Sequence, residues 1–303
     1  MRRIPSLFSV VFALLVVPVG ALVPAGAHAQ VEDQDRPTAA QDRQAEDRAD
    51  QVLAEALDRY HTSLQGIRSI EMEIVQMGMP THMRMEVVEE PGAPPRVQPV
   101  SVTVMGMEID PGQADFPGGA GIFETPLEDL RGVYRYEGEV ELQGRMAHHL
   151  SFVDPDPSGM AGEMMGEAAV EFLDGEGALY LDVETFDLLR MEWVGEVLHE
   201  GEREPLSMIM VSEDYREESG YRYPAVTRVE TDAARFSMTD EEREMLRAQL
   251  DQLAGTVPEG ELPEGEMGEM MAGLLAQVDQ FTRMLEEGVM EIELEMRDVR
   301  VER

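Results

Sequence analysis

Methionine is the residue type that offers this chain the most chemistry, with 23 methionines in 303 residues. Several of them lie two positions apart, and on a β-strand both members of such a pair face the same side of the sheet. Flexible, polarisable thioethers adapt to irregular apolar surfaces, so inward-facing pairs predict a cavity for a ligand with acyl chains. The alternative is that they fill an ordinary core. The pairs are Met77 and Met79, Met83 and Met85, Met105 and Met107, and Met208 and Met210.

Thioethers and imidazoles are also ligands of Cu(I), and His82 lies between two of the methionine pairs. Packing accounts for the same residues, so we predict no metal site and no cofactor. His148 and His149 are adjacent, and a strand sends adjacent side chains to opposite faces. They therefore cannot share a metal, and we expect one packed and one exposed histidine.

Catalytic motifs are missing from the sequence. There is no cysteine nucleophile, no G-x-S-x-G turn, no H-E-x-x-H, no phosphate-binding loop and no dinucleotide fingerprint. Acidic residues are so numerous, 62 in all, that no pair of them stands out as a catalytic dyad. Arg190 and Arg216 are candidates for holding a lipid carbonyl or phosphate, with pairing to a neighbouring glutamate as the alternative. The sequence thus predicts a protein that is not an enzyme.

The net charge of −38 excludes some partners. A surface this acidic repels phosphate backbones and anionic lipid head groups, so neither nucleic acid binding nor electrostatic adsorption to a membrane is expected. Residues 1–29 have the pattern of a secretory signal peptide, with Arg2 and Arg3 before an apolar run and Ala27-His28-Ala29 at its end. The chain contains no cysteine for lipid attachment. We therefore expect a periplasmic protein without a lipid anchor.

The region that must position these residues is 179–230, where apolar and polar residues alternate as in strands with one buried face. The alternation predicts four antiparallel strands, with tight connections at residues 182–187 and 217–220 and a charged loop at 195–204. Tyr180, Met191 and Trp193 fall on these strands, and we assign them to the cavity wall.

Further elements lie on either side of this region. Residues 30–48 are polar and predict a disordered leader. A stripe of apolar residues over 50–64 predicts an amphipathic helix that ends at Gly66. Strands are expected over 67–79, with a phase slip after Ile74, and over 83–87 after a turn at Pro80-Thr81. Others are expected at 97–109, in a hairpin across Gln143-Gly144, and at 290–301, which closes the sheet.

Residues 239–288 are predicted to form a helical insert before the last strand. A capping pattern and a heptad-like apolar seam indicate two amphipathic helices, whose apolar stripes need a surface to cover. The open mouth of the barrel is the expected place, so that this insert acts as a lid. The lid residues are Met271, Leu274, Val278 and Phe281.

The stretches LYLD, VETFDLLR and DYREESGYRYPAVTRVE resemble the C-terminal half of the LolA/LolB-like family of outer-membrane lipoprotein-sorting proteins. The resemblance covers residues 50–230 and the last strand. It implies an α+β, mainly antiparallel, unclosed barrel with an N-terminal amphipathic helix, formed by a single domain over residues 49–303. The residues that match the family's strand-joining motif are Asp214, Tyr215, Arg216, Gly220 and Pro224.

What the resemblance implies is the shuttling of lipid or lipoprotein between membranes. Together with the methionine pattern, it leads to the expectation of a periplasmic carrier for a hydrophobic ligand, with a lipid or an acylated protein as its partner. The alternative is a non-enzymatic sensor or scaffold module of the same fold, whose partner would be a membrane-bound protein.

Overall fold

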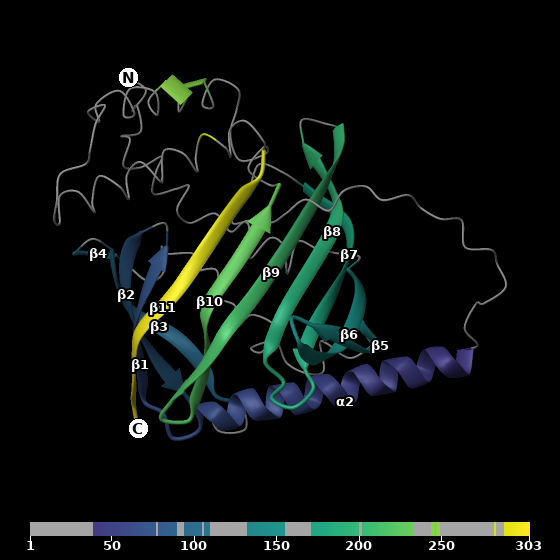
Figure 1. The fold of residues 1–303 in the computed structure, drawn as a ribbon, viewed down its shortest axis with the longest axis horizontal. Helices are drawn as coiled ribbons and strands as arrows, with labels where there is room; N and C mark the ends of the chain where they lie inside the picture. Colours follow the sequence, from purple (N-terminus) through teal and green to yellow (C-terminus); the bar gives the residue numbers. More distant parts are fainter. Residues whose placement is uncertain are drawn as a thin grey trace.

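The computed structural model describes residues 39–76, 78–89, 94–104, 106–109, 132–154, 171–199, 202–232 and 288–303, and a few isolated positions between 244 and 282. The described strands form one eleven-stranded sheet in the order β4-β3-β2-β1-β11-β10-β9-β8-β7-β6-β5, in which all neighbours are antiparallel. The two edge strands do not pair with each other, so the sheet is open. The predicted mainly antiparallel, unclosed fold is thus confirmed (Figure 1).

The strands occupy most of the described chain. Their bounds are β1 (Ser69–Gln76), β2 (Met79–Val88), β3 (Arg96–Val104), β4 (Met107–Ile109), β5 (Tyr134–Leu142), β6 (Arg145–Asp154), β7 (Glu171–Asp182), β8 (Leu188–His199), β9 (Glu202–Glu218), β10 (Tyr221–Thr231) and β11 (Met290–Glu302). The predicted closing strand, β11, pairs with both β1 and β10 and so joins the first and last parts of the sheet.

Two hairpins turn where the sequence predicts. Gln143 and Gly144 have φ of 53° and 78°, and Ser219 and Gly220 have φ of 51° and 82°. Positive φ at both central residues is the mark of the type I′ turn, whose twist matches that of antiparallel strands. The hairpin of β5 and β6 is therefore confirmed, and the predicted turn at 217–220 narrows to its last two residues.

The first hairpin differs from the prediction. The chain turns between Gln76 and Met79, which pair with each other, and Gly78 there has a φ of 77°. Pro80 already lies in β2 opposite Val75.

The phase slip after Ile74, which predicts either a bulge or a strand covered on both faces, marks no bulge, because β1 pairs with β2 without interruption. Ile74 and Val75 are both half-buried, which agrees with the second alternative. The irregularity lies in β11, where Asp298 has a φ of 49° and forms a bulge against β1.

Two further predictions of strand limits need correction. The single strand expected over 97–109 is divided into β3 and β4 by a turn at Gly106, whose φ is 80°. The charged loop expected over 195–204 is paired strand up to His199 and from Glu202 onward. Its charges are compatible with a strand because Arg203 bonds across the hairpin to Glu196, at 2.8 Å.

The described helix, α2 (Ala39–Leu64), lies across one end of the sheet (Figure 1). It buries the predicted apolar stripe and stops before Gly66, whose φ is 71°. It begins earlier than expected, so the predicted disordered leader is helical from Ala39 on. Contacts with β5 explain the extension, because Arg135 holds Asp42 at 2.7 Å and Ala49 is fully buried.

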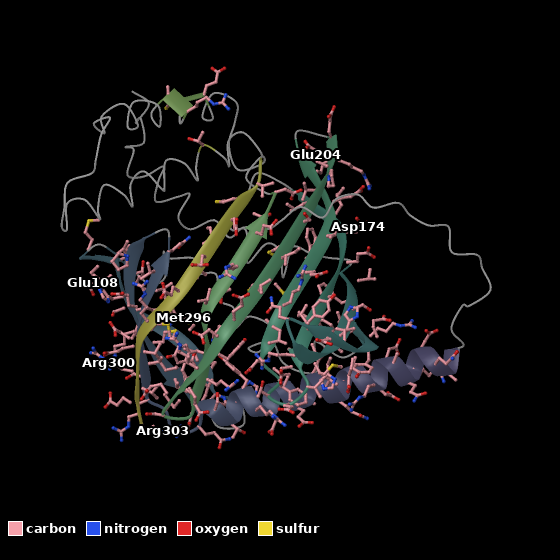
Figure 2. The ribbon with its side chains drawn as sticks, viewed as in Figure 1. Glu108, Asp174, Glu204, Met296, Arg300 and Arg303 are labelled. Carbon is pink, nitrogen blue, oxygen red and sulfur yellow. The ribbon has the colours of Figure 1, made fainter. Side chains whose placement is uncertain are left out.

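Arg303 ties α2 to the sheet at this end (Figure 2). Its guanidinium group donates to the carbonyl oxygen of Gln65 at 3.1 Å and to that of Ser219 at 2.6 and 2.8 Å. The end of the helix, the β9–β10 turn and the end of β11 are therefore joined at one point. We call this side of the sheet the α2 end and the opposite side the open end.

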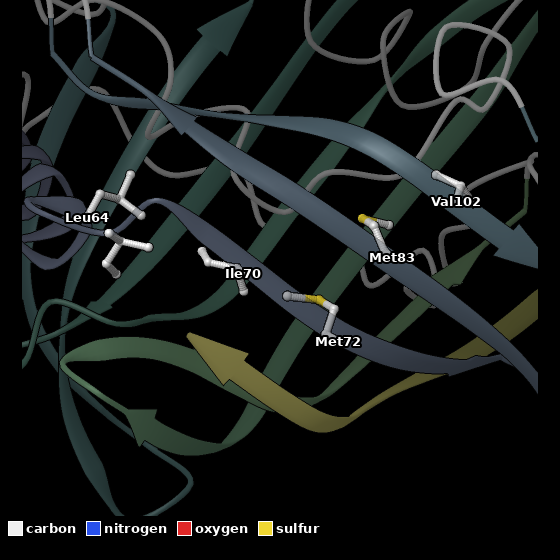
Figure 3. Close-up of a cluster of buried hydrophobic side chains, with 6 residues drawn as sticks. Leu64, Ile70, Met72, Met83 and Val102 are labelled. Carbon is white, nitrogen blue, oxygen red and sulfur yellow. The ribbon is translucent and has the colours of Figure 1, made fainter. Parts of the chain in front are cut away.

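A hydrophobic cluster fills the space where α2 meets the first strands (Figure 3). The cluster brings the last turn of the helix onto β1, β2 and β3. Its buried members are Leu64, Ile67, Ile70, Met72, Met83 and Val102. No helix in the described part of the chain is long and apolar enough to cross a membrane. The expected signal peptide lies outside the described residues, and so does the helical insert apart from a few isolated positions.

Candidate ligand-binding face

Two rows of side chains cross seven strands on one face of the sheet, which we call the inner face. None of these residues is charged, and all are buried except Tyr136 and Gly177, which are half-buried. The first row is Tyr136, Leu150, Leu179, Met191, Met210, Val229 and Ile292, and the second is Tyr134, Phe152, Gly177, Trp193, Met208, Thr231 and Met290.

The outer face of the same strands is polar. Its rows are His149, Tyr180, Arg190, Val211, Arg228 and Glu293, and Ser151, Ala178, Glu192, Ile209, Glu230 and Glu291. Ion pairs run along it, since Arg190 contacts Glu192 and Arg228 contacts Glu293 at 2.8 Å. Burying one large apolar side chain contributes about 1.5–3 kcal/mol. The sheet is therefore strongly amphipathic, and its inner face is the one that must be kept from water.

Trp193 is a buried aromatic side chain on the inner face near the open end, with an exposed fraction of 2%. Its indole lies against Gly175 and Gly195, which pair with each other on β7 and β8. A Cβ atom added to Gly175 would come within 2.5 Å of the indole ring, and one added to Gly195 would also meet it. The two glycines therefore leave the space that the indole occupies.

The structure brings four of the predicted cavity residues together. Met191 lies opposite Met210, and Trp193 lies opposite Met208, all on the inner face of β8 and β9. The sequence signal that found them is the alternation along these strands. The same signal extends to inner-face residues that the prediction left out, including Phe152 and Met290.

The other predicted cavity residues do not join this group. Met83 is buried and Met85 half-buried, but both belong with the cluster at the α2 end. Met107, on the edge strand, is 52% exposed. Met79 lies in β2 opposite Gln76. Outside the described residues lie Met77, Met105 and the lid residues Met271, Leu274, Val278 and Phe281.

Tyr180 is a correction to the predicted cavity wall. Leu179 and Leu181 take the inner face of β7, so Tyr180 points to the outer face, where it stacks on His149 with the ring centroids 4.7 Å apart. An aromatic residue on a half-buried strand fits either face. Only the register of its neighbours decides which face it takes.

A network of charged side chains holds the β7–β8 turn at the α2 end. Asp187, which is 7% exposed, accepts hydrogen bonds from the guanidinium group of Arg222 at 2.7 Å and from that of Arg145 at 3.1 Å. The hydroxyl of Thr185 donates to the same carboxylate at 2.6 Å. The hydrogen bonding that Arg222 donates to Asp187 is the largest cause that raises the pKa of Arg222.

Asp182 begins the same turn. Its carboxylate accepts the backbone N–H groups of Glu184 and Thr185 at 2.9 and 2.7 Å, and Nε of Arg145 at 2.8 Å. Burial alone would raise the pKa of Asp182, but these donors outweigh it and hold the pKa below its ordinary value. Tyr215, from the predicted family motif, donates to the carbonyl oxygen of Leu188 at 2.8 Å. Burial raises the pKa of this tyrosine. The motif thus serves to fix strands.

His148 is the packed member of the histidine pair, 3% exposed between two aromatic rings. Its ring lies 5.8 Å from that of Tyr136 and 5.4 Å from that of Phe186. Two arginines of α2 cover these rings, since Arg48 lies 5.4 Å over Tyr136 and Arg59 lies 4.5 Å over Phe186. The imidazole is therefore part of the contact between the helix and the sheet.

The pKa of His148 is lowered, and burial is the largest cause because it disfavours the charged imidazole. The carboxylate of Glu139, at 3.8 Å, works against the shift, and so do Glu55 and Asp182 at longer range. The charge of Arg48 adds to the lowering. Burial and Arg48 outweigh the three carboxylates, so the folded protein favours the neutral ring.

We expect the free energy of unfolding to fall with acidification because of His148. Its pKa is lower in the folded chain than the ordinary 6.5, so its contribution is complete above pH 6.5 and is lost as the pH falls below 6.5 toward the folded value. Urea unfolding at several pH values between about 5 and 8 measures this slope. His148→Gln should flatten the slope and His149→Gln should keep it; the same slope in both variants would refute the assignment.

A depression of about 680 Å³ lies at the α2 end. It is lined by the ends of β1, β2 and β11, including Arg68, Arg84, Glu86, Glu302 and Arg303. None of the predicted cavity residues borders it. This depression is polar and belongs to a different part of the sheet from the inner-face rows.

No cluster of metal-binding side chains is found in what the structure describes. No group of three or more His, Asp or Glu side chains is placed there to hold a metal ion. His82, which the copper alternative requires, lies beside Glu73 at 3.5 Å. The absence of a metal site stays a prediction.

Fold and face together define a protein with a wide, open antiparallel sheet, apolar on one face and capped by a helix at one end. The sequence matches no family model. A search of curated proteins also finds no match.

Solved structures with similar folds are distant. A DUF1329 family protein from Desulfovibrio piger aligns over 84% of this chain and 92% of its own, with 9% identity and a TM-score of 0.39. The lipoprotein LppX of Mycobacterium tuberculosis covers 47% of this chain and 87% of its own, with 11% identity and a TM-score of 0.25. LprF of Mycobacterium bovis covers 48% and 86%, with 13% identity and a TM-score of 0.24.

Proposed function

We propose that this protein binds a hydrophobic ligand, a lipid or the acyl chains of an acylated protein, on the inner face of its sheet, and that it carries this ligand in the periplasm without transforming it. The observation that supports the proposal is the pair of uncharged inner-face rows, which run without interruption across seven strands of a sheet that does not close on itself.

Side-chain chemistry on the inner face favours acyl chains. Met208 lies opposite Trp193, and Met191 and Met210 are the next facing pair on the inner face of β8 and β9. Unbranched thioethers conform to a flexible chain more readily than branched side chains do. The expected signal peptide supports export. The resemblance of the turn motifs to the LolA/LolB-like family supports a carrier.

Trp193 makes the proposal testable, because it is the only tryptophan of the chain and it lies on the inner face. Bromine atoms quench indole fluorescence only at close range. A brominated fatty alcohol is therefore expected to quench Trp193 in a saturable manner, and the unbrominated alcohol of the same length is not. A fluorescence titration of the purified chain measures both.

A matched variant moves the reporter to the other side of the sheet. In a Trp193→Phe, Tyr180→Trp double variant the single tryptophan stands on the outer face of β7. In this variant, saturable quenching by the brominated alcohol should be lost. In the unaltered protein, adding the unbrominated alcohol as a competitor should reverse the quenching of Trp193. Equal quenching in both proteins, or none in either, would refute binding on the inner face.

A further inference from the structure

Trp193 is the largest fully buried side chain in the described part of the chain. Phe152 and Met208, which belong to the same inner-face row, are buried as well. The space along this row is therefore occupied by the protein's own side chains. A hydrocarbon chain can lie on the inner face here only if one of these side chains moves.

Backbone without side chains lies beneath the aromatic rings of this row. Gly175, Gly177 and Gly195 take inner-face positions on the paired strands β7 and β8. We call these three residues the glycine floor. A Cβ atom added to Gly175 would come within 2.5 Å of the Trp193 ring, and one added to Gly177 within 2.5 Å of the Phe152 ring. The two rings thus take the space that side chains of β7 and β8 would otherwise fill.

The indole of Trp193 covers two residues of the glycine floor. The ring lies against both Gly175 and Gly195, which face each other across the strand pair. Glycine weakens the interior of a strand, and it often marks a place where a ligand or another group approaches the backbone closely. Movement of this one ring would therefore open the inner face down to the backbone of both strands.

The neighbours of the indole can adjust to such a movement. Met208 lies opposite Trp193, and Met210 follows it on the inner face of β9. Methionine side chains have three rotatable bonds and refit easily to a changed neighbour. Phe152, the other ring over the glycine floor, packs against Tyr134 with the ring centroids 5.2 Å apart. We therefore assign Phe152 to the wall of the site and the movement to Trp193.

We infer that Trp193 is a gate: its indole closes the glycine floor, and an alkyl chain binds by displacing the indole and lying on the glycine floor in its place. This inference rests on the proposed function and deepens it by naming the side chain that regulates the site. Only molecules in which the ring has moved can bind, so the apparent affinity is reduced by the fraction of molecules in that state. Removing the ring should therefore raise the affinity for an alkyl chain.

Truncation of the gate and truncation of a wall residue should have opposite effects. Trp193→Ala should bind a long-chain alcohol at least about 10-fold more tightly than the unaltered protein, because no ring has to be displaced. Met208→Ala, on the facing strand, should bind the alcohol more weakly because it loses apolar contact. Met208→Ala also leaves a cavity at the same place in the sheet, so it controls for binding to an artificial cavity.

A competition assay measures these affinities without a tryptophan. The dye N-phenyl-1-naphthylamine becomes more fluorescent in apolar surroundings, and its displacement by the alcohol gives the affinity of each variant. If Trp193→Ala does not unfold cooperatively in urea, Trp193→Leu takes its place, since it keeps an apolar side chain and should still bind more tightly than the unaltered protein.

The kinetics of the unaltered protein provide a second test. The rate at which a brominated alcohol quenches Trp193 should level off as the alcohol concentration rises, because movement of the ring precedes binding. A merely structural tryptophan would give a rate that rises in proportion to the concentration throughout.

Three results would overturn the gate while the proposed function stands. They are no gain in affinity in Trp193→Ala or Trp193→Leu, an equal gain in Met208→Ala, and a quenching rate that does not level off. If the alcohol neither displaced the dye from the unaltered protein nor, in its brominated form, quenched Trp193, the proposed function itself would be overturned.

Discussion

An Asp187→Ala variant is expected to lose about 3 kcal/mol of unfolding free energy. The carboxylate is buried and is the acceptor for Arg222, Arg145 and the hydroxyl of Thr185. Removing one partner of a buried ion pair typically costs about 3–5 kcal/mol, because the remaining charge stays desolvated. The lower end applies here, since the arginine side chains are each 34% exposed and retain some contact with water.

Glu196→Ala provides the matched control. Glu196 also binds an arginine, Arg203, at 2.8 Å, but both side chains are about half exposed or more. Exposed pairs contribute about 0–1 kcal/mol, so this variant should differ little from the unaltered protein. Urea unfolding of both variants measures the difference. Equal losses would show that the Asp187 network is no more than a surface ion pair.

Asp187→Ala should also loosen the attachment of α2 to the sheet. The β7–β8 turn that Asp187 holds also presents the carbonyl group of Glu184 and the ring of Phe186 to Arg59 of the helix. A displaced turn weakens both contacts, so hydrogen exchange in the middle of α2 should become faster in Asp187→Ala than in Glu196→Ala. Unchanged hydrogen exchange in α2 would show that the Asp187 network does not help to attach the helix.

This network marks the limit of what the sequence predicts. Asp187 and Arg222 are 35 residues apart, and Arg145 is 42 residues from Asp187. Among 62 acidic residues, nothing local distinguishes the two that are buried from those that are solvated. The sequence places the turn at 182–187 correctly, but its role in joining three hairpins depends on strand register.

Strand alternation and turn chemistry predict most of the sheet. The paired strands β5 to β10 follow from apolar residues at every second position, and Gly144 and Gly220 supply the positive φ that their hairpins need. Alternation does not say which side of an isolated strand is buried, so the sequence alone places Tyr180 on the wrong face. Proline is common in turns, so the sequence predicts a turn at Pro80. The positive φ that the turn needs is instead provided by Gly78.

Gly177→Ala is expected to destabilise the protein by about 3 kcal/mol, although it adds a single methyl group. Gly177 lies between Phe152 and Trp193 in the second inner-face row. An added Cβ would come within 2.5 Å of the Phe152 ring and would also collide with the backbone carbonyl oxygen of Glu192. That oxygen belongs to β8, so it cannot move without disturbing the pairing of β7 and β8.

Gly175→Ala on the same strand distinguishes a close contact with the backbone from a close contact with a side chain. The three atoms nearest to its added Cβ all belong to the indole of Trp193, which is a side chain and not backbone. The loss of unfolding free energy should therefore be smaller, about 1–2 kcal/mol, and the emission of Trp193 should shift to longer wavelength as the ring leaves its place. If Gly177→Ala were tolerated as well as Gly175→Ala, the close backbone contact would not constrain the sheet. If Gly175→Ala left the emission unchanged, the glycine pair would not be what holds the indole on the inner face.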